Sequence, residues 1–145
     1  FTTLQPNVGF VYTEDGNRVL LADIPGIIEG AHANKGLGYE FLRHIERTKV
    51  LLFVVDAGST EGRDPREDFK ILQQELKKYD PELLKKPYLI CLNKIDVDGA
   101  MEHIKQFKLS NRKHSKHIYL TSALDGEGLA SLKKAIIDSC QLICP

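Results

Sequence analysis

Short apolar runs alternate along this chain with longer stretches in which apolar residues recur every three or four positions. Runs of the first kind predict strands, and patterns of the second kind predict helices. The predicted strands cover residues 50–55, 87–92 and 117–120, and the predicted helices cover residues 38–48, 64–76, 98–108 and 128–140. Two earlier β-prone runs, residues 7–12 and 18–24, flank Asp15-Gly16, a dipeptide typical of hairpin turns. Because strands and helices alternate after this hairpin, the sequence predicts an α/β fold, with a mostly parallel sheet and an antiparallel edge hairpin.

The apolar runs differ in how deeply they should be buried. Residues 50–55 form the most continuous apolar and β-branched run, so we expect a central parallel strand there. Residues 19–22 are apolar at successive positions, which predicts burial on both faces of the sheet. Residues 7–12 mix polar and apolar side chains and suit an edge.

Composition excludes several classes of protein. The chain has 145 residues with 20 Lys and Arg against 20 Asp and Glu, so no overall charge points to nucleic acid or an anionic membrane. The chain has no apolar run of the roughly 18 residues that a membrane span needs. Three cysteines, Cys91, Cys140 and Cys144, show no Cys-x-x-Cys spacing, which favours reduced thiols and a cytoplasmic protein over a disulfide framework or a zinc site.

Three predicted strands end in polar clusters, and parallel strands place such ends at one edge of a sheet, where ligands bind. The clusters are Asp23-Ile-Pro-Gly26, Asn93-Lys94-Ile-Asp96 and Thr121-Ser-Ala-Leu124. Each cluster alone has an ordinary explanation, namely a turn, a solvated lysine or a helix cap. Their order and spacing together predict a nucleotide site.

The second cluster has the chemistry that guanine requires. The Asp96 carboxylate can accept both the ring N–H and the exocyclic amine of guanine, while the Asn93 amide can donate to the acceptor edge of the base. The methylenes of Lys94 can cover the flat face of the base while the ammonium stays hydrated. The Asp23 carboxylate is suited to hold Mg²⁺ through a water molecule, and the backbone N–H of Gly26 can donate to a terminal phosphate.

These motifs resemble those of the Obg family of ribosome-associated P-loop GTPases, in the translation-factor-related class. Residues 1–9 are similar to switch I of that family, and residues 23–32, followed by 36–38 and 41–48, are similar to its switch II and the next helix. The resemblance extends from residue 1 to about residue 140. It implies a three-layer P-loop GTPase fold and a GTP-hydrolysing switch that uses GTP or GDP and Mg²⁺ and acts with ribosomal RNA or proteins in assembly of the large subunit.

The resemblance also implies roles for individual residues. Thr3 would ligate Mg²⁺ near the γ-phosphate, Asp23 would hold Mg²⁺ through water, and the Gly26 amide would contact the γ-phosphate. The guanine base would be bound by three residues of one motif, Asn93, Lys94 and Asp96. Ser122 and Ala123 would support the base through a short contact and a main-chain N–H.

Two departures from the general GTPase pattern limit these implications. The phosphate-binding motif Gly-x-x-x-x-Gly-Lys-[Ser/Thr] does not occur in these 145 residues, and in this fold it lies upstream of switch I. We therefore expect residues 1–145 to be a partial G domain, with flanking domains in the full-length protein and an upstream part of the same protein completing the sheet. The chain alone should not fold and should be inactive. Ile27 occupies the position where many GTPases place the glutamine that orients water, which implies slow intrinsic hydrolysis.

Two other functions stay open at this point. A nucleotide-free scaffold that recruits partners would explain the missing phosphate-binding motif. A phospho-receiver domain is less favoured, because Asn-Lys-x-Asp has no role there. The basic run of residues 112–117 could contact RNA phosphate, although a solvated loop before a strand is the more common outcome for such a run.

Overall fold

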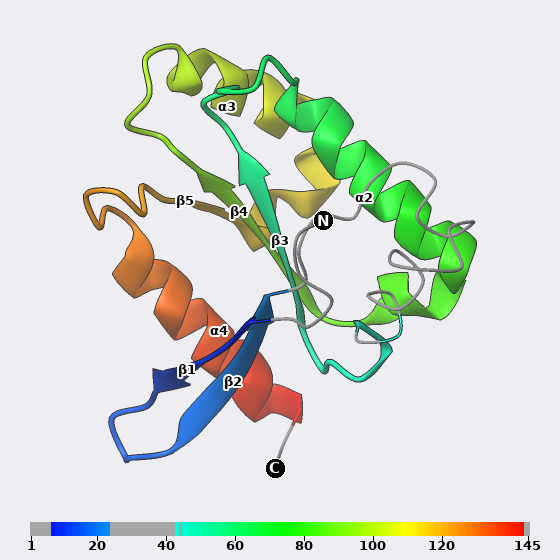
Figure 1. Ribbon diagram of the computed structural model, residues 1–145, viewed down its shortest axis with the longest axis vertical. Coiled ribbons are helices and arrows are strands. Elements are labelled where there is room, and N and C mark those ends of the chain that lie inside the picture. Colours follow the sequence, from blue (N-terminus) through cyan, green and yellow to red (C-terminus); the bar gives the residue numbers. More distant parts are fainter. Residues whose placement is uncertain (1–6, 24–42, 44, 144–145) are drawn as a thin grey trace. The chain divides into compact units, whose positions relative to one another are not determined.

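The structure is a computed structural model that describes residues 7–23, 43 and 45–143, and its strands form two sheets. The strands are β1 (Asn7–Tyr12), β2 (Arg18–Asp23), β3 (Leu51–Asp56), β4 (Tyr88–Asn93) and β5 (Ile118–Leu120). The helices are α2 (Pro65–Tyr79), α3 (Ala100–Ser110) and α4 (Leu129–Ile143), with 3₁₀ helices η2 (Pro81–Lys85) and η3 (Arg112–His117) (Figure 1). β1 pairs with β2 in an antiparallel hairpin, whereas β3, β4 and β5 form a parallel sheet with β4 in the middle.

The chain divides into two compact units. The sheet unit comprises residues 50–70 and 88–136 and contains the parallel sheet. The hairpin unit comprises the described residues of 1–49, 71–87 and 137–143.

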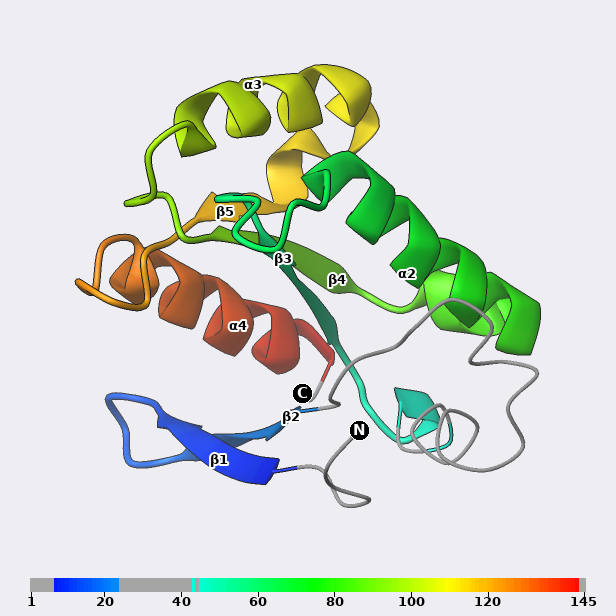
Figure 2. The ribbon, with the colours of Figure 1, turned by 45° about the horizontal axis from the view of Figure 1, so that its top comes forward.

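The parallel sheet brings three polar strand ends together in the sheet unit. Asp56 is the register partner of Asn93, and Leu92 is the partner of Leu120, so the residue after β5 is Thr121 at the same edge. Figure 2 shows α3 and the first half of α4 on opposite faces of this sheet. The layered arrangement leaves the carboxyl ends of the strands as the place where loops gather.

Aromatic rings fasten the helices of the sheet unit to one face of the sheet. The Phe69 ring of α2 lies 5.3 Å from Phe53 of β3 in an edge-to-face contact and 5.5 Å from Phe107 of α3. Phe69 and Phe107 are almost fully buried. Burying a phenylalanine stabilises a fold by about 1.5–3 kcal/mol, and edge-to-face pairs add to that. This cluster therefore fixes the first turns of α2, up to residue 70, and α3 relative to the strands that carry the polar ends.

The basic run of residues 112–117 forms the 3₁₀ helix η3 before β5, and Arg112, Lys113 and Lys116 are exposed to solvent as predicted, but His114 contributes to this core, which was not predicted. His114 is 9% exposed, and its ring meets Phe69 and Tyr88 edge to face. His114 Nδ1 shares a hydrogen bond with the Tyr88 hydroxyl, and Tyr88 also stacks on His117 at 4.2 Å. Burial lowers the pKa of His114, and the charges of Lys113 and His117 lower it further.

The hairpin has the predicted turn but not the predicted burial. The backbone N–H of Thr13 donates to Asn17 O at 2.8 Å across a turn in which Gly16 has φ 87°, a conformation that favours glycine. Leu20 is 59% exposed, and β2 pairs only with β1 in the described part of the chain, so the prediction that residues 19–22 are buried on both faces is wrong.

The parallel strands and the helices after residue 64 agree with the sequence prediction within about three residues at each end. β3 was predicted to be a central strand, but it lies at an edge of the described sheet, and Val54 is 58% exposed. Of the helix predicted over residues 38–48, Arg43, Ile45 and Glu46 are described as helical, and Ile45 is buried as expected. No helix in the described residues is long and apolar enough to cross a membrane.

Candidate functional site at the carboxyl ends of the parallel strands

The loops that follow β4 and β5 are joined by backbone hydrogen bonds. Thr121 N donates to Leu92 O at 2.9 Å, which continues the sheet by one residue, and Ile95 N donates to Thr121 O at 3.2 Å. Ser122 N donates to Glu127 O at 2.9 Å, and this bond closes the loop after β5 on itself. Backbone hydrogen bonds alone thus hold the motif of residues 93–96 beside the motif of residues 121–124.

The side chain of Asn93 connects the two loops. Its Oδ1 accepts hydrogen bonds from the backbone N–H of Ala123 and from the hydroxyl of Thr121, each at 3.0 Å. Because a backbone N–H can only donate, the amide oxygen of Asn93 must face the protein and its NH₂ must face away. That NH₂ group has no hydrogen-bond partner among the described residues, so it is free to donate to a ligand.

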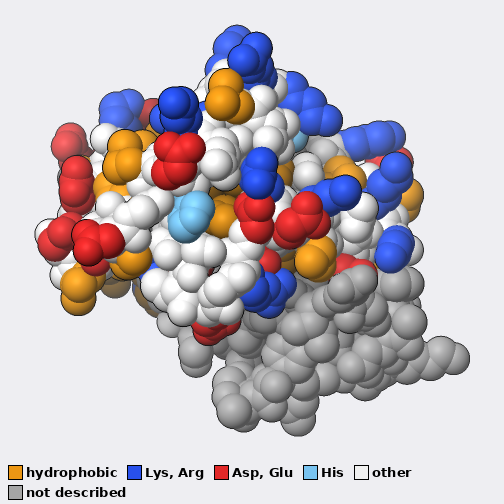
Figure 3. Space-filling model, turned by 90° about the horizontal axis from the view of Figure 1, so that it is seen from above, with side chains coloured by type: hydrophobic (Ala, Val, Ile, Leu, Met, Phe, Trp, Pro, Cys, Tyr) orange, Lys and Arg blue, Asp and Glu red, His pale blue; other side chains and the backbone are white. Residues whose placement is uncertain are grey.

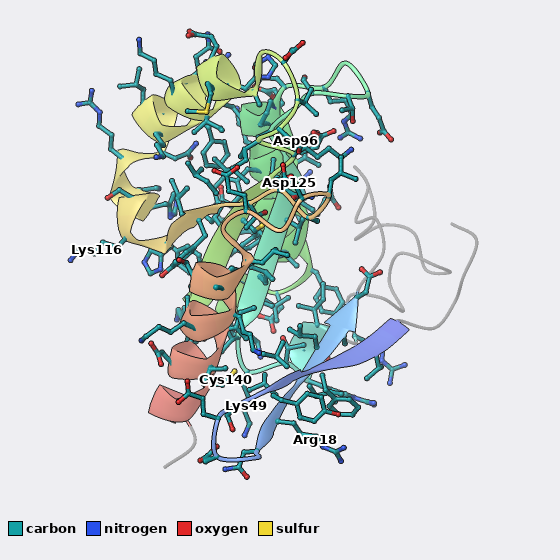
Figure 4. All side chains as sticks on the ribbon, turned by 90° about the vertical axis from the view of Figure 1, so that its left-hand side faces the viewer. Arg18, Lys49, Asp96, Lys116, Asp125 and Cys140 are labelled. Carbon is teal, nitrogen blue, oxygen red and sulfur yellow. The ribbon has the colours of Figure 1, made fainter. Side chains whose placement is uncertain are left out.

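Asp96 is oriented by a buried serine. The Ser122 hydroxyl, which is fully buried, donates to Asp96 Oδ1 at 2.9 Å and accepts a longer bond, 3.4 Å, from the Asp125 N–H. Asp96 itself is exposed, and its Oδ2 has no partner in the described part of the chain. Figure 4 shows Asp96 and Asp125 at the same end of the parallel sheet. A carboxylate has about four acceptor positions, and here one is used to fix its direction while the others remain open.

Lys94 has a strained backbone and an anchored side chain. Its φ of 67° lies in the left-handed region, which is uncommon for a residue with a Cβ and costs about 1–3 kcal/mol. The Lys94 ammonium lies 3.3 Å from Asp56 Oδ2 and donates to the Thr60 hydroxyl at 2.9 Å. The side chain therefore crosses from the loop after β4 to the loop after β3.

Asp56 is the centre of that anchor. Its Oδ1 accepts from Gly58 N at 2.8 Å, and its Oδ2 accepts from both the N–H and the hydroxyl of Thr60. Partial burial would by itself raise the pKa of Asp56, but the bonds from Thr60, Lys94 and Gly58 outweigh burial, so the pKa lies below its usual value. Asp56 is consequently a carboxylate at neutral pH and a lasting partner for the lysine.

The loop after β3 also packs tightly against the loop after β4. A Cβ added at Gly58 would lie 2.9 Å from Val97 Cβ, closer than side chains pack, and Ala57 N donates to Asn93 O at 2.9 Å. A side chain at residue 58 would push these loops apart, which explains the glycine there. Three loops, after β3, β4 and β5, therefore form one connected edge.

The structure brings five of the predicted site residues together at this edge, namely Asn93, Lys94, Asp96, Ser122 and Ala123. The N–H of Ala123, predicted to contact the base, here donates to Asn93 instead.

Of the remaining predicted residues, the structure describes Asp23 alone. Asp23 ends β2 in the hairpin unit, where it is exposed and pairs in register with Asn7. Thr3, Gly26 and Ile27 lie outside the described residues.

Sequence reasoning gave no role to Asp56, Thr60 or Thr121, which all hold other site residues in place. A signal for Asp56 was present, because it ends an apolar strand in the same way as Asp23 and Asn93. Thr60 left no comparable signal, since it is one of several polar residues in a turn.

Among the described residues, no group of three His, Cys, Asp or Glu side chains is placed to hold a metal ion, and Cys144 lies outside these residues. Cys91 is buried in β4 with its sulfur 3.1 Å from the Thr121 hydroxyl. Burial raises the pKa of Cys91 above its usual value, although the bond to Thr121 acts in the opposite direction. Cys91 is therefore a buried neutral thiol that packs in the core.

Comparison with known proteins relates this edge to GTPases. The chain is 53% identical over 132 residues to GTPase Obg of Protochlamydia amoebophila, covering 91% of this chain and 39% of that protein. It is 49% identical over 143 residues to GTPase Obg of Oceanobacillus iheyensis, covering 99% of this chain and 33% of that protein. The chain thus spans between a third and two fifths of the length of these two curated relatives. The predicted resemblance to the Obg family is confirmed.

A solved structure of Era, in complex with MgGDPNP and nucleotides 1506–1542 of 16S ribosomal RNA, resembles this fold with a TM-score of 0.67. The sequence identity is 26%, and the match covers 95% of this chain and 45% of that one. The predicted GTPase fold is therefore confirmed. The sequence model of the 50S ribosome-binding GTPases matches residues 1–94, well over half of the 145 residues, and the chain therefore belongs to this GTPase family.

Proposed function

We propose that this chain is the guanine-recognising part of a GTP-binding, slowly GTP-hydrolysing switch. The observation that carries the proposal is the cross-connection of two loops, in which Asn93 and Asp96 are each held by the loop after β5. Both side chains keep free hydrogen-bonding groups on an exposed edge: the NH₂ of Asn93 and the Oδ2 of Asp96. Such fixed and partly unsatisfied polar groups are what a specific binding site requires.

The free groups match guanine and not adenine. Guanine presents two adjacent donors, the ring N–H and the exocyclic amine, which a carboxylate held like Asp96 can accept together. Adenine has an unprotonated ring nitrogen at the corresponding position, so it would face the carboxylate with a lone pair. The NH₂ of Asn93 can donate to an acceptor on the other edge of guanine.

Lys94 would cover one face of the bound base. Its ammonium is held by Asp56 and Thr60, so its methylenes are fixed across the gap between two loops instead of moving in solvent. A fixed apolar stem loses less conformational entropy when the base binds. Asp56 and Thr60 would then act as positioning residues for the lysine.

The phosphate end of the site would use Thr3, Asp23 and Gly26, with Mg²⁺ held by the hydroxyl of Thr3 and, through water, by Asp23. Asp23 fits this use because it is an exposed oxygen ligand at the end of a strand, the kind of ligand that Mg²⁺ prefers. Mg²⁺ would neutralise the charge that develops on the phosphate oxygens during hydrolysis. With isoleucine at position 27, no side chain there can orient the attacking water, so we expect slow intrinsic turnover.

A ribosomal partner in the cytoplasm is part of the same proposal. The family is described as 50S ribosome-binding GTPases, and the structurally similar Era was solved with a segment of 16S ribosomal RNA. We therefore propose that the full-length protein signals its nucleotide state to the ribosome during assembly of the large subunit.

Base selection by the full-length protein tests the proposal. In competition binding with fluorescent GDP, GTP should displace the probe at least ~10⁴-fold more effectively than ATP, because a site built around hydrogen bonds rejects a ligand that leaves them unpaired. The Asp96→Asn variant should shift its preference from GTP toward xanthosine triphosphate, whose 2-oxo group needs a donor. An unchanged preference would contradict the base assignment. Absence of guanine nucleotide binding by the wild-type protein would favour the nucleotide-free scaffold.

A further inference from the structure

One segment of this electrically neutral chain contains positive charge alone. Residues 103–124 contain no Asp or Glu, although the chain has 20 of these residues in all. The same segment contains five cations: Lys105, Lys108, Arg112, Lys113 and Lys116. These five residues, on α3 and η3, are called the basic strip below.

All five side chains of the basic strip are exposed, and none of them forms an ion pair with the described residues. Lys105 and Lys108 lie on the outer side of α3, because the inner side is occupied by the buried Ile104 and Phe107. Figure 3 shows Lys and Arg side chains at the upper edge of the face seen from above, with Asp and Glu side chains elsewhere on that face, and Figure 4 shows Lys116 projecting outward from η3.

The cations of the strip follow one another along α3 and η3 with no acidic side chain between them. Lys105 and Lys108 are three residues apart on α3, and Arg112, Lys113 and Lys116 follow on η3. Some cations elsewhere in the chain do have an acidic partner, as Lys85 does in Glu82. The strip therefore carries positive charge that its own segment does not compensate.

We propose that the basic strip binds the phosphate backbone of RNA. The inference rests on the proposed ribosomal partner and assigns to it a surface on this chain, separate from the nucleotide site. A uniform row of Lys and Arg matches the uniform negative charge of a phosphate chain, and such contacts position a protein on nucleic acid without reading its sequence. An acidic protein surface is less well matched, because protein interfaces combine charges of both signs to fix their register.

The strength of such binding depends on salt in a predictable way. Each phosphate that a cation neutralises makes the slope of log K against log salt steeper by about 0.7–0.9. If Lys105, Lys108 and Arg112 each contact one phosphate, replacing all three should make the slope shallower by roughly 2–2.7. At 0.1 M salt this corresponds to a loss of affinity of roughly 100- to 500-fold.

The experiment compares two triple variants of the full-length protein with wild type. The test variant is Lys105→Gln, Lys108→Gln and Arg112→Gln. The matched control is Lys70→Gln, Lys77→Gln and Lys133→Gln, three exposed lysines outside the strip, so that both variants lose the same charge. The probe is a fluorescein-labelled RNA hairpin of arbitrary sequence, titrated between 50 and 300 mM KCl, with poly-L-glutamate as a competitor. Binding of fluorescent GDP and sedimentation with purified 50S subunits are measured in parallel.

The strip variant should lose RNA affinity and salt dependence as stated, while the control variant stays within about threefold of wild type and all three proteins bind GDP equally. Equal RNA affinity of the two variants, or no RNA binding by wild type, would overturn the proposal. Competition by poly-L-glutamate as effective as that by unlabelled RNA would overturn the choice of RNA in favour of an acidic protein. If wild type binds the hairpin but neither GDP nor 50S subunits, the proposed function fails while the RNA surface stands.

Discussion

Replacing Ser122 by alanine tests whether the loop after β5 controls the base site. Ser122 is fully buried, and its hydroxyl donates to Asp96 Oδ1 at 2.9 Å, so the substitution removes one charge-assisted hydrogen bond and leaves the backbone of the loop unchanged. A hydrogen bond to a charged group contributes about 1.5–3 kcal/mol. Because Asp96 is exposed, water will replace part of this bond, and we expect a loss of about 1–2 kcal/mol.

That loss corresponds to nucleotide affinity roughly 5- to 30-fold weaker, since 1.4 kcal/mol is a factor of ten. The effect should be the same for GDP and GTP, because in the proposed site Asp96 would contact the base and not the phosphates. Equilibrium titration of the full-length protein with fluorescent GDP and a non-hydrolysable GTP analogue gives both values. Ser131→Ala is the matched control, because Ser131 is exposed on α4.

Two results would refute this reasoning. If Ser122→Ala lowers the melting temperature but leaves both affinities within twofold of the control, Ser122 is only a packing residue. If GTP affinity falls much more than GDP affinity, the serine acts at the phosphate end, and the positions assigned to Asp96 and Ser122 are wrong.

Three further predictions follow from the same edge and its supporting core. Asp56→Asn should accelerate GDP release about 2- to 5-fold in stopped-flow measurements, because a partly exposed ion pair contributes about 0.5–1 kcal/mol. An unchanged rate would show that the ion pair with Asp56 is not needed to hold Lys94. In urea unfolding, Gly128→Ala should destabilise the protein by at least about 2 kcal/mol more than Gly62→Ala. Both glycines have positive φ, but of the two only residue 128 would place a Cβ against a carbonyl oxygen, Leu120 O at 2.0 Å. Equal effects of the two substitutions would refute this clash. The pKa of His114 is lowered in the folded state, so neutral His114 contributes its full stabilisation above the unfolded pKa of about 6.5. As the pH falls from 6.5 toward the folded pKa, this stabilisation is lost by up to about 1.4 kcal/mol per pH unit. Hydrogen exchange of the β4 amides, corrected for intrinsic rates, should show this loss in wild type and not in His114→Gln, and parallel pH profiles of the two proteins would contradict it.

The fold could be predicted from the sequence largely because each parallel strand is a continuous run of apolar and aromatic residues that ends in, or is directly followed by, a polar residue. Burial was predicted less well. Leu20 belongs to an apolar run, but apolar character reports what a strand can bury and not which neighbours it has, and β2 pairs only with β1 in the described residues. The burial of His114 within residues 112–117 was missed for a different reason. Charge dominates that run, and a single histidine, His114, enters the core through its ring contacts with Phe69 and Tyr88.

The candidate site shows a similar division between residues that meet a ligand and residues that hold them. Asn93 and Asp96 could be proposed from the sequence because their residue types match the hydrogen-bonding groups of guanine. Thr121 and Ser122 act through these two residues: one hydroxyl donates to the Asn93 oxygen and the other to the Asp96 carboxylate. Sequence gives the order of such residues but not the pairing between loops, which depends on the register of β4 and β5. A polar cluster at a strand end therefore need not face the ligand. Here the cluster after β5 serves mainly to fix the cluster after β4, and the fixed direction of Asp96 is what would let a single exposed carboxylate distinguish guanine from adenine.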